Sequence, residues 1–261
     1  MEKTKKILVT GANGQLGLSL KDVSLNYPNI QFHFKNSTEL DITNEKQIEE
    51  LFAISNFDYC INCAAYTNVE EAEKTPEIAF KVNAEGVKNI AKACKEFEVL
   101  LIHISTDYVF DGEKKEPYTV ADAPNPINEY GKSKLAGEKY IEEISNYYYI
   151  VRTSWLYSKI HGRNFYKTIL EKAKKGEVIK ITDEQVGCPT DTKNLANFIL
   201  EQLITRKEKF GIIHFSDQVA MTWYDFACQI LKVNGVNNNE LLVKDRNYRT
   251  FARRPNNSVL R

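Results

Sequence analysis

The sequence has no net charge and no long apolar stretch. Among its 261 residues, Lys plus Arg and Asp plus Glu each count 35. The overall charge that would attract a nucleic acid or an anionic membrane is therefore missing, and we expect neither as a partner. No run approaches the roughly 18 apolar residues that span a bilayer. The start, Met1-Glu2-Lys3-Thr4-Lys5-Lys6, leads directly into Ile7-Leu8-Val9 without the pattern of a signal peptide. We expect a cytoplasmic protein.

The sequence also lacks a complete metal-binding pattern, and its one possible redox motif is better explained as part of a buried strand. The five cysteines include a C-x-x-C at Cys60 and Cys63. It lies in an apolar run typical of a buried strand, and no second C-x-x-C or histidine pair completes a tetrahedral site. The four histidines show no ligand spacing. We therefore expect no metal site.

What the sequence does contain is an alternation of strand-length apolar runs with segments of helical spacing. This alternation predicts an α/β fold, a Rossmann-like doubly wound parallel sheet with helices on both faces. The asparagines Asn234 and Asn237–Asn239 predict a loop. The predicted strands are 5–10, 30–34, 57–62, 99–105 and 148–153, with shorter runs at 178–182 and 212–215, and a helical pattern covers 79–94.

The strands become shorter and farther apart from about residue 155. We therefore expect two parts. Residues 1–154 form the sheet domain, including the segment around residue 130, and residues 155–261 form a smaller, less regular part, some segments of which return to the main sheet. In an open α/β sheet the ligand binds beyond the carboxyl ends of the strands, so the second part is expected to cover the substrate.

A glycine loop follows the first predicted strand directly. It reads Gly11-Ala12-Asn13-Gly14-Gln15-Leu16-Gly17, and such glycines let a pyrophosphate approach the backbone at a helix N-terminus. This makes 1–154 the predicted NAD(P)-binding domain. After the second strand, Lys35 stands where an acidic residue would bind the ribose of NAD, so we expect NADPH to be preferred, with NADH possible. Asp41 and Ile42 are expected at the adenine side.

A tyrosine and a lysine stand four residues apart, at Tyr130 and Lys134, on one face of a predicted helix. A nearby ammonium lowers the pKa of a phenol, so Tyr130 could exchange a proton with a carbonyl near neutral pH. Such pairs also arise by chance in a chain with 14 tyrosines. Thr106, at the end of the fourth predicted strand, places a hydroxyl at the edge where this fold gathers its ligands.

These motifs together resemble the extended short-chain dehydrogenase/reductases, and within them the dTDP-4-dehydrorhamnose reductase branch. The resemblance runs in family order from residue 7 to residue 260. It rests further on Asn62-Cys63-Ala64-Ala65-Tyr66-Thr67-Asn68-Val69-Glu70, Ser105-Thr106-Asp107-Tyr108-Val109-Phe110, Arg152-Thr153-Ser154-Trp155, Asp183-Glu184-Gln185-Val186-Gly187-Cys188-Pro189-Thr190, Thr222-Trp223-Tyr224-Asp225-Phe226 and Arg253-Arg254-Pro255-Asn256-Asn257-Ser258-Val259-Leu260.

The resemblance implies hydride transfer from NADPH to C4 of dTDP-4-dehydro-L-rhamnose, giving dTDP-L-rhamnose. Tyr130 would protonate the alkoxide, Lys134 would hold the nicotinamide ribose, and Thr106 would bind the ketone. Cys63 would be a small apolar side chain beside the cofactor. The expected cofactor residues are Gly11, Asn13, Gly14, Gln15, Leu16, Gly17, Lys35, Asp41, Ile42, Cys63, Ala64, Ala65, Tyr66, Asn83, Tyr130 and Lys134. The expected substrate residues are Val69, Glu70, Thr106, Asp107, Tyr108, Trp155, Asn164, Gln185 and Arg254.

Two other functions stay open at this point. The same chemistry could act on another nucleotide-linked 4-keto-deoxysugar, for example to give dTDP-6-deoxy-L-talose. The alternative outside the enzymes is a noncatalytic regulatory subunit that binds a nucleotide. A binding protein, however, has no need of the Tyr130 and Lys134 pair.

The sequence also departs from the family. Some members are magnesium-assisted homodimers that use three glutamates. Ser19 and Lys193 occupy the first two matching positions, and the third lies beyond Arg261. A lysine cannot ligate a hard cation, so we expect no such site. Relatives usually continue past the motif that matches Arg253–Leu260 into a further helix. We therefore expect the packing that this helix would supply, and any dimer contact that depends on the helix, to differ in this protein.

Overall fold

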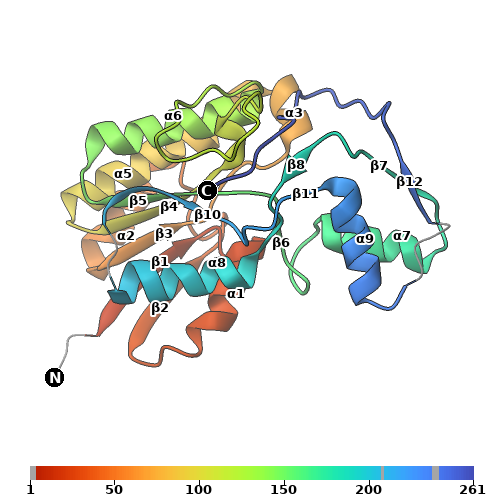
Figure 1. Ribbon diagram of the computed structural model, residues 1–261. Coiled ribbons are helices and arrows are strands. Elements are labelled where there is room, and N and C mark those ends of the chain that lie inside the picture. The colour runs from red at the N-terminus through yellow and green to blue at the C-terminus, as the bar shows by residue number, and fades with distance from the viewer. Residues whose placement is uncertain (1–3, 207–208, 237–240) are drawn as a thin grey trace.

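The computed structural model describes residues 4–206, 209–236 and 241–261, and a six-stranded parallel sheet forms its larger part (Figure 1). The spatial order is β10-β5-β4-β3-β1-β2. The predicted fold class is therefore confirmed, and each predicted strand of this sheet lies within two residues of the observed one. The strands are β1 (Lys5–Thr10), β2 (Ile30–Lys35), β3 (Tyr59–Asn62), β4 (Leu100–Thr106), β5 (Tyr148–Thr153) and β10 (Gly211–Phe215).

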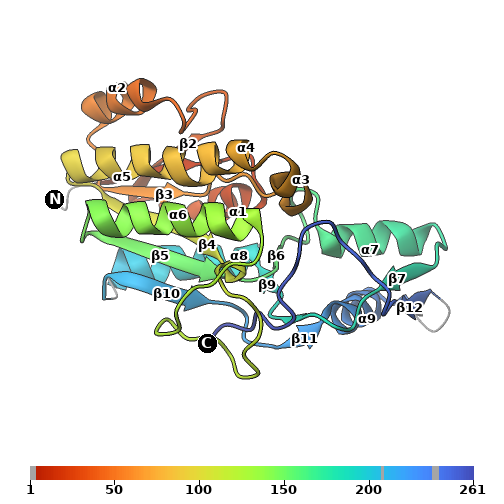
Figure 2. The same cartoon turned by 90° about the horizontal axis from the view of Figure 1, so that it is seen from above.

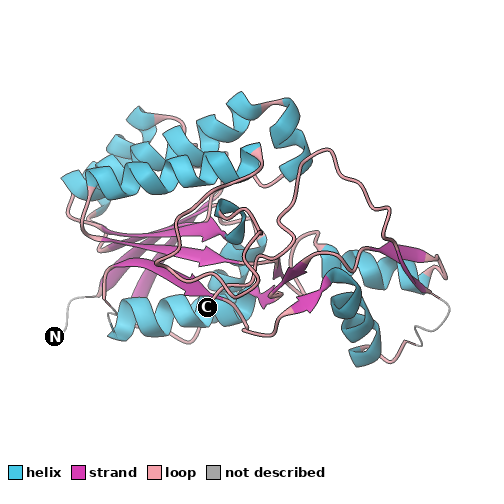
Figure 3. Ribbon diagram, turned by 45° about the horizontal axis from the view of Figure 1, so that its top comes forward, coloured by secondary structure: helices cyan, strands magenta, loops and turns pink. Residues whose placement is uncertain are grey.

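Helices cover both faces of this sheet (Figure 3). Because neighbouring side chains of a strand point to opposite faces, Ile7 and Val9 pack with one helix layer and Leu8 with the other. The first layer contains α1 (Gln15–Ser24) and α8 (Thr192–Phe198), which continues into the π-helical η3 (Ile199–Arg206), and the second contains α2 (Glu45–Ser55), α5 (Gly86–Glu96) and α6 (Glu129–Ile144).

The helical pattern over 79–94 is interrupted. A π-helical turn, η1 (Lys81–Glu85), lies between α4 and α5 and contains the buried Asn83. Such turns often occur beside functional sites. The remaining helical elements of this part are α3 (Val69–Lys74), α4 (Pro76–Phe80) and the short 3₁₀ turn η2 (Asp107–Val109).

A smaller part lies beyond the carboxyl ends of the sheet strands (Figure 2). Its own core joins Ile169, Ile181, Phe226 and Leu242 from four elements. The chain also returns to the main sheet, since α8 and β10 both follow residue 155; the boundary at 154/155 itself stays a prediction. The predicted loop at 237–239 lies outside the described residues. The elements are β6 (Leu156–Tyr157), α7 (Phe165–Lys174), β7 (Ile179–Ile181), β8 (Val186–Gly187), β9 (Thr190–Asp191), β11 (Met221–Thr222), α9 (Trp223–Val233) and β12 (Leu242–Lys244).

The strand register places the functional motifs together at the carboxyl ends of the sheet strands. Thr10 pairs with Asn62, and Thr106 with Thr153, so the loops after β1, β3, β4 and β5 leave the sheet at the same end. The strand order reverses between β1 and β3, which is where an open α/β sheet binds its ligand. Within the described ranges, none of the helices combines the length and the apolar character needed to cross a bilayer.

Candidate active site

The glycine loop packs directly against the loop after β3. Gly11 has a φ of +63°, and a Cβ built on it would lie 2.6 Å from the Ala64 nitrogen. Only glycine suits this position, because the backbone is left-handed and the neighbouring chain leaves no room for a side chain. Gly14 then caps α1 without a side chain, so the N–H groups of the first helical turn face the loop.

Two cavities, of about 360 and 350 Å³, are lined in part by this loop. They contain most of the expected cofactor residues. Lys35 and Asn83 do not line them, although Asn36 and Ser37, which follow Lys35, do. Val82 and Arg163 also line these cavities, and sequence reasoning missed both because no local pattern marks them. The expected residues found there are Gly11, Asn13, Gly14, Gln15, Leu16, Gly17, Asp41, Ile42, Cys63, Ala64, Ala65, Tyr66, Tyr130 and Lys134.

Asn83 lies behind the cavity rather than in it. Its Oδ1 accepts a hydrogen bond from the Tyr66 nitrogen at 2.8 Å, and its Nδ2 donates to the Tyr66 oxygen at 2.9 Å and to Ser133 Oγ at 3.0 Å. The side chain is fully buried. It therefore fixes the loop after β3 against α6, and it acts on a ligand only through that loop.

The three expected catalytic residues come together. Asn128 caps α6 through the Gly131 nitrogen, which places Tyr130 in the first turn. Thr106 and Tyr130 line a third cavity of about 340 Å³, while Tyr130 and Lys134 line one of the two cavities beside the glycine loop. Tyr130 thus stands where the two cavities meet.

The expected lowering of the pKa of Tyr130 is wrong for this structure. Burial raises that pKa, and a hydrogen bond with Thr106 offsets only part of the effect. The Lys134 ammonium group does not compensate, because its Nζ donates to the Ile104 oxygen at 2.7 Å and lies 3.2 Å from His103 Nε2. Burial lowers the pKa of Lys134 to about 8, against the opposing effect of the Glu138 charge. Tyr130 is therefore a neutral phenol with a proton to give.

Cys63 is not a reactive thiol. Burial raises the pKa of its thiol, so it stays protonated at neutral pH and acts as a small side chain beside the glycine loop. This agrees with the expectation drawn from the sequence.

The expected substrate residues divide into two groups. Val69, Thr106, Asp107, Tyr108, Trp155 and Arg254 line the third cavity. The other three support it: Glu70 binds Arg254 Nη2 at 2.8 Å, Asn164 caps α7 and donates to Gln15 Oε1 at 2.8 Å, and Gln185 accepts from Trp223 Nε1 at 3.1 Å.

The orientation of the Trp155 ring is fixed by contacts with neighbouring residues. Its ring stacks on that of Trp223, with centroids 3.5 Å apart and planes 4° from parallel. On the same ring, a Cβ built on Gly187 would come within 2.4 Å. The φ of Trp155 is +45°, rare for a bulky residue, so these contacts must fix it. Trp223, which also lines the cavity, was quoted in a motif but not expected as a site residue.

Asp107 joins the cavity wall to the C-terminal motif. It is 2% exposed. Burial raises its pKa to about 6, although hydrogen bonds with Ser258, Thr106 and Ser154 act in the opposite direction. This carboxyl group therefore holds the strand ends together as well as facing the cavity.

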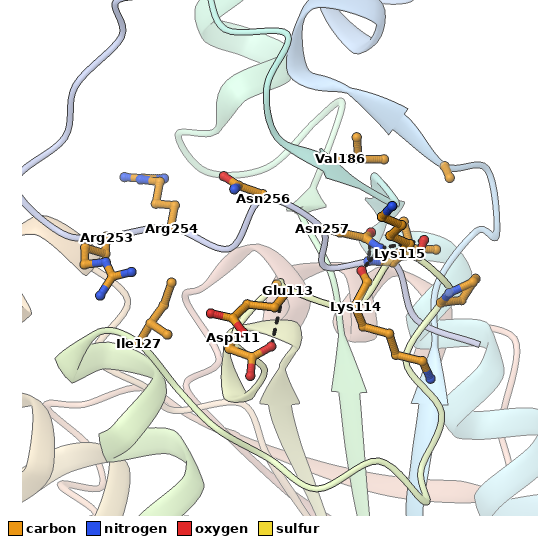
Figure 4. Close-up of a pocket in the computed structure, with 14 residues that line it drawn as sticks. Asp111, Glu113, Lys114, Lys115, Ile127, Val186, Arg253, Arg254, Asn256 and Asn257 are labelled. Carbon is orange, nitrogen blue, oxygen red and sulfur yellow. Dashed lines mark hydrogen bonds between the residues drawn. The ribbon is translucent and has the colours of Figure 1, made fainter.

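A larger cavity of about 940 Å³ adjoins this site and shares Arg254 with it. It lies between residues 111–117 and 253–259. Figure 4 shows the two arginines, Arg253 and Arg254, at one end of the lining and the two lysines, Lys114 and Lys115, at the other. Buried Arg254 Nε has no hydrogen-bond partner among the described residues. Such a cavity offers several cations to an anionic ligand.

The two positions expected to have lost a magnesium ligand have other contacts. Ser19 Oγ lies 2.7 Å from Thr192 Oγ1, and Lys193 is exposed at the start of α8. Across residues 4–206, 209–236 and 241–261 there is no group of three or more His, Cys, Asp or Glu side chains placed to hold a metal ion.

Comparison with known proteins agrees with this geometry. The family model described as "RmlD substrate binding domain" matches residues 5–261. A dTDP-4-dehydrorhamnose reductase of Aggregatibacter actinomycetemcomitans is 36% identical over 98% of this chain and 90% of its own length. A dTDP-4-keto-6-deoxy-D-glucose reductase of Streptomyces niveus is 35% identical over 89% and 80%.

A solved structure is equally similar. The dTDP-4-dehydrorhamnose reductase of Bacillus anthracis in complex with NADP has a TM-score of 0.94 and 37% identity, over 99% of this chain and 91% of its own. The chain belongs to the RmlD substrate-binding domain family of dTDP-4-dehydrorhamnose reductases.

Proposed function

We propose that this protein uses NADPH to reduce the C4 ketone of dTDP-4-dehydro-L-rhamnose to the alcohol, giving dTDP-L-rhamnose. The observation that carries the proposal is the position of Tyr130, a partly buried phenol that lines both the cavity beside the glycine loop and the cavity beside Trp155. The names of the relatives support the substrate and the pathway.

The residues of the glycine loop fit a dinucleotide. A side chain at Gly11 would fill the close approach to Ala64, and the free N–H groups at the start of α1 suit a pyrophosphate. Arg163 adds a cation to the same cavity. The bound nicotinamide would supply the hydride.

The protein's own groups would handle the proton. As the carbonyl carbon accepts hydride, its oxygen becomes an alkoxide, and the Tyr130 hydroxyl gives it a proton. Thr106, within hydrogen-bond reach of Tyr130, would donate to the same oxygen. A charged Lys134 would favour the phenolate that remains.

The diphosphate of the substrate would bind beside Arg254. This guanidinium stands between the third cavity and the 940 Å³ cavity, and its contact with Glu70 orients it. Arg253 and Lys115 line the larger cavity as further cations. A few placed charges therefore serve a doubly anionic ligand in a chain of zero net charge.

A second candidate changes the sugar and keeps the chemistry. The relative named for dTDP-4-keto-6-deoxy-D-glucose supports a reductase of another nucleotide-linked 4-keto-deoxysugar. The C4 configuration of the product, which separates rhamnose from 6-deoxy-talose, depends on how the sugar lies against Trp155.

We also propose a cytoplasmic setting. No disulfide joins any of the five cysteines, all of which lie within the described residues, and this suits a reducing compartment. A nucleic acid or a membrane is not part of the proposed function. We further predict that the protein forms a homodimer, to be tested by sedimentation of the purified protein.

The decisive experiment supplies enzymatically generated dTDP-4-dehydro-L-rhamnose with NADPH, follows the loss of cofactor absorbance, and identifies the product sugar. Rhamnose supports the proposal, and a talose product supports the second candidate. Tight NADPH binding without turnover would indicate a regulatory subunit. As the control, Tyr130→Phe should lower kcat by orders of magnitude and leave the Kd of NADPH nearly unchanged, because it removes only the proton donor.

A further inference from the structure

His103 is a buried titratable group that the reduction described above does not use. It lies in the middle of β4 and is 0% exposed. Its Nε2 is 3.2 Å from Lys134 Nζ, and its Nδ1 is 3.1 Å from Asn62 Nδ2. Both ring nitrogens are therefore engaged, one by a residue beneath the glycine loop and the other by the lysine of the active site.

The Asn62 amide has one favourable orientation. Its Oδ1 accepts from Thr10 Oγ1 at 2.6 Å and from the Ala64 nitrogen at 3.3 Å. Rotating the amide by 180° would turn its NH₂ group toward the Ala64 N–H, so that two donors would face each other. The hydrogen-bond network thus assigns the Asn62 NH₂ group to His103 Nδ1.

This orientation determines the tautomer of the imidazole. Since Nδ1 accepts a hydrogen bond, the single proton of a neutral ring is on Nε2, pointing at Lys134. The ring is neutral because burial, together with the nearby charge of Lys134, lowers the pKa of His103 well below its usual value.

An ammonium group and an Nε2–H group make a poor pair. Both are donors, and an ammonium nitrogen has no lone pair. A neutral amine at Lys134 accepts from Nε2–H and still donates to the Ile104 oxygen at 2.7 Å. The contact therefore stabilises the neutral form of the lysine.

We propose that His103 is a positioning residue which, held in its Nε2–H tautomer by Asn62, reduces the proton affinity of Lys134 and so sets the upper pH limit of the reduction. The proposal rests on the proposed function, in which the charged lysine assists Tyr130.

The other groups around Lys134 also affect its protonation. Glu138, one turn along α6, favours the ammonium, while burial lowers the pKa of Lys134 to about 8. Cys63, from the loop after β3, is a neutral thiol. Tyr130 precedes it by one turn of the same helix. The rate should therefore be high below this pKa and fall as the pH rises through it.

The kinetic test compares His103→Gln with His33→Gln, a substitution on β2 outside the site. A glutamine can turn its amide oxygen toward Nζ and accept from the ammonium. The alkaline limb of kcat for the sugar nucleotide, at saturating NADPH, should move upward by about one pH unit, a tenfold gain in the proton affinity of Lys134. His33→Gln should keep the wild-type profile. An unmoved limb in His103→Gln would overturn the proposal.

A second test needs neither turnover nor a folded His103 variant. Nitrogen-15 NMR of the wild-type imidazoles distinguishes the two tautomers, and variants of His33, His161 and His214 assign the remaining signals to His103. A proton on Nε2 between pH 6 and 9 is expected, and a proton on Nδ1 would refute the inference. Because this measurement needs no substrate, its failure is distinct from absence of reductase activity, which would refute the proposed function.

Discussion

The ion pair between Arg152 and Glu138 connects two elements of the active-site framework, and removing one partner should strongly destabilise the protein. Arg152 Nη2 lies 2.6 Å from Glu138 Oε2, and Nε lies 3.1 and 3.2 Å from the two carboxylate oxygens. The two side chains are 2% and 0% exposed. Ser105 donates to the same carboxylate, and the guanidinium lies over the ring of Phe110. The pair joins β5 to α6, which carries Tyr130.

Replacing Arg152 by methionine would leave the buried carboxylate without its partner. We expect the free energy of unfolding to fall by about 3 to 5 kcal/mol, the usual cost of breaking such a pair. Urea unfolding followed by circular dichroism measures it. The matched control is Lys46→Met, which breaks the exposed pair of Lys46 and Glu50 (84% and 67% exposed) and should change stability by less than about 0.5 kcal/mol.

The double variant Arg152→Met with Glu138→Gln separates charge from packing. With no charge left buried, it should be more stable than the sum of the single changes predicts, by about 2 kcal/mol or more. Additive single effects would refute this reasoning.

Three further results are expected. Gly187→Ala should raise the KM for the sugar nucleotide several-fold and spare NADPH binding, because the added Cβ meets the ring of Trp155 at 2.4 Å; an unchanged KM would argue against Trp155 as a substrate contact. The free energy of unfolding of Asp107→Asn should rise by about 3 kcal/mol relative to that of the wild type as the pH increases from 4 to 6. The Asp107 carboxyl has a folded-state pKa of about 6, so its ionisation destabilises the folded wild type over this pH range, whereas the asparagine cannot ionise. Parallel stability curves for the two proteins would contradict this expectation. Lys35→Ala should lower kcat/KM for NADPH more than for NADH, and a wild type that prefers NADH would contradict the assignment of Lys35.

Local patterns in the sequence determined the sheet, the glycine loop and the family. Strands alternate side chains with a period of two and helices with one near 3.6, so Lys5–Thr10 and Tyr148–Thr153 could be placed without a structure, and both are confirmed. The glycine spacing after β1 needs only one strand and one helix, which are neighbours in the chain. The individual site residues stay predictions, although most of the expected ones line the cavities of this edge.

Tertiary structure alone decided which side chains meet. Glu70 and Arg254 were both expected to bind substrate, and the fold brings these two side chains into contact across 184 residues. The sequence offered no reason to single out His103, because it shows no spacing typical of a metal ligand. Only the structure shows that its position on β4 brings it into contact with Lys134. These contacts depend on which strands and loops, far apart in the chain, come close together in space. Neither the spacing of residues nor the composition shows which of them will do so. The same burial that brings Tyr130 into the site raises its pKa, which the four-residue spacing to Lys134 could not reveal.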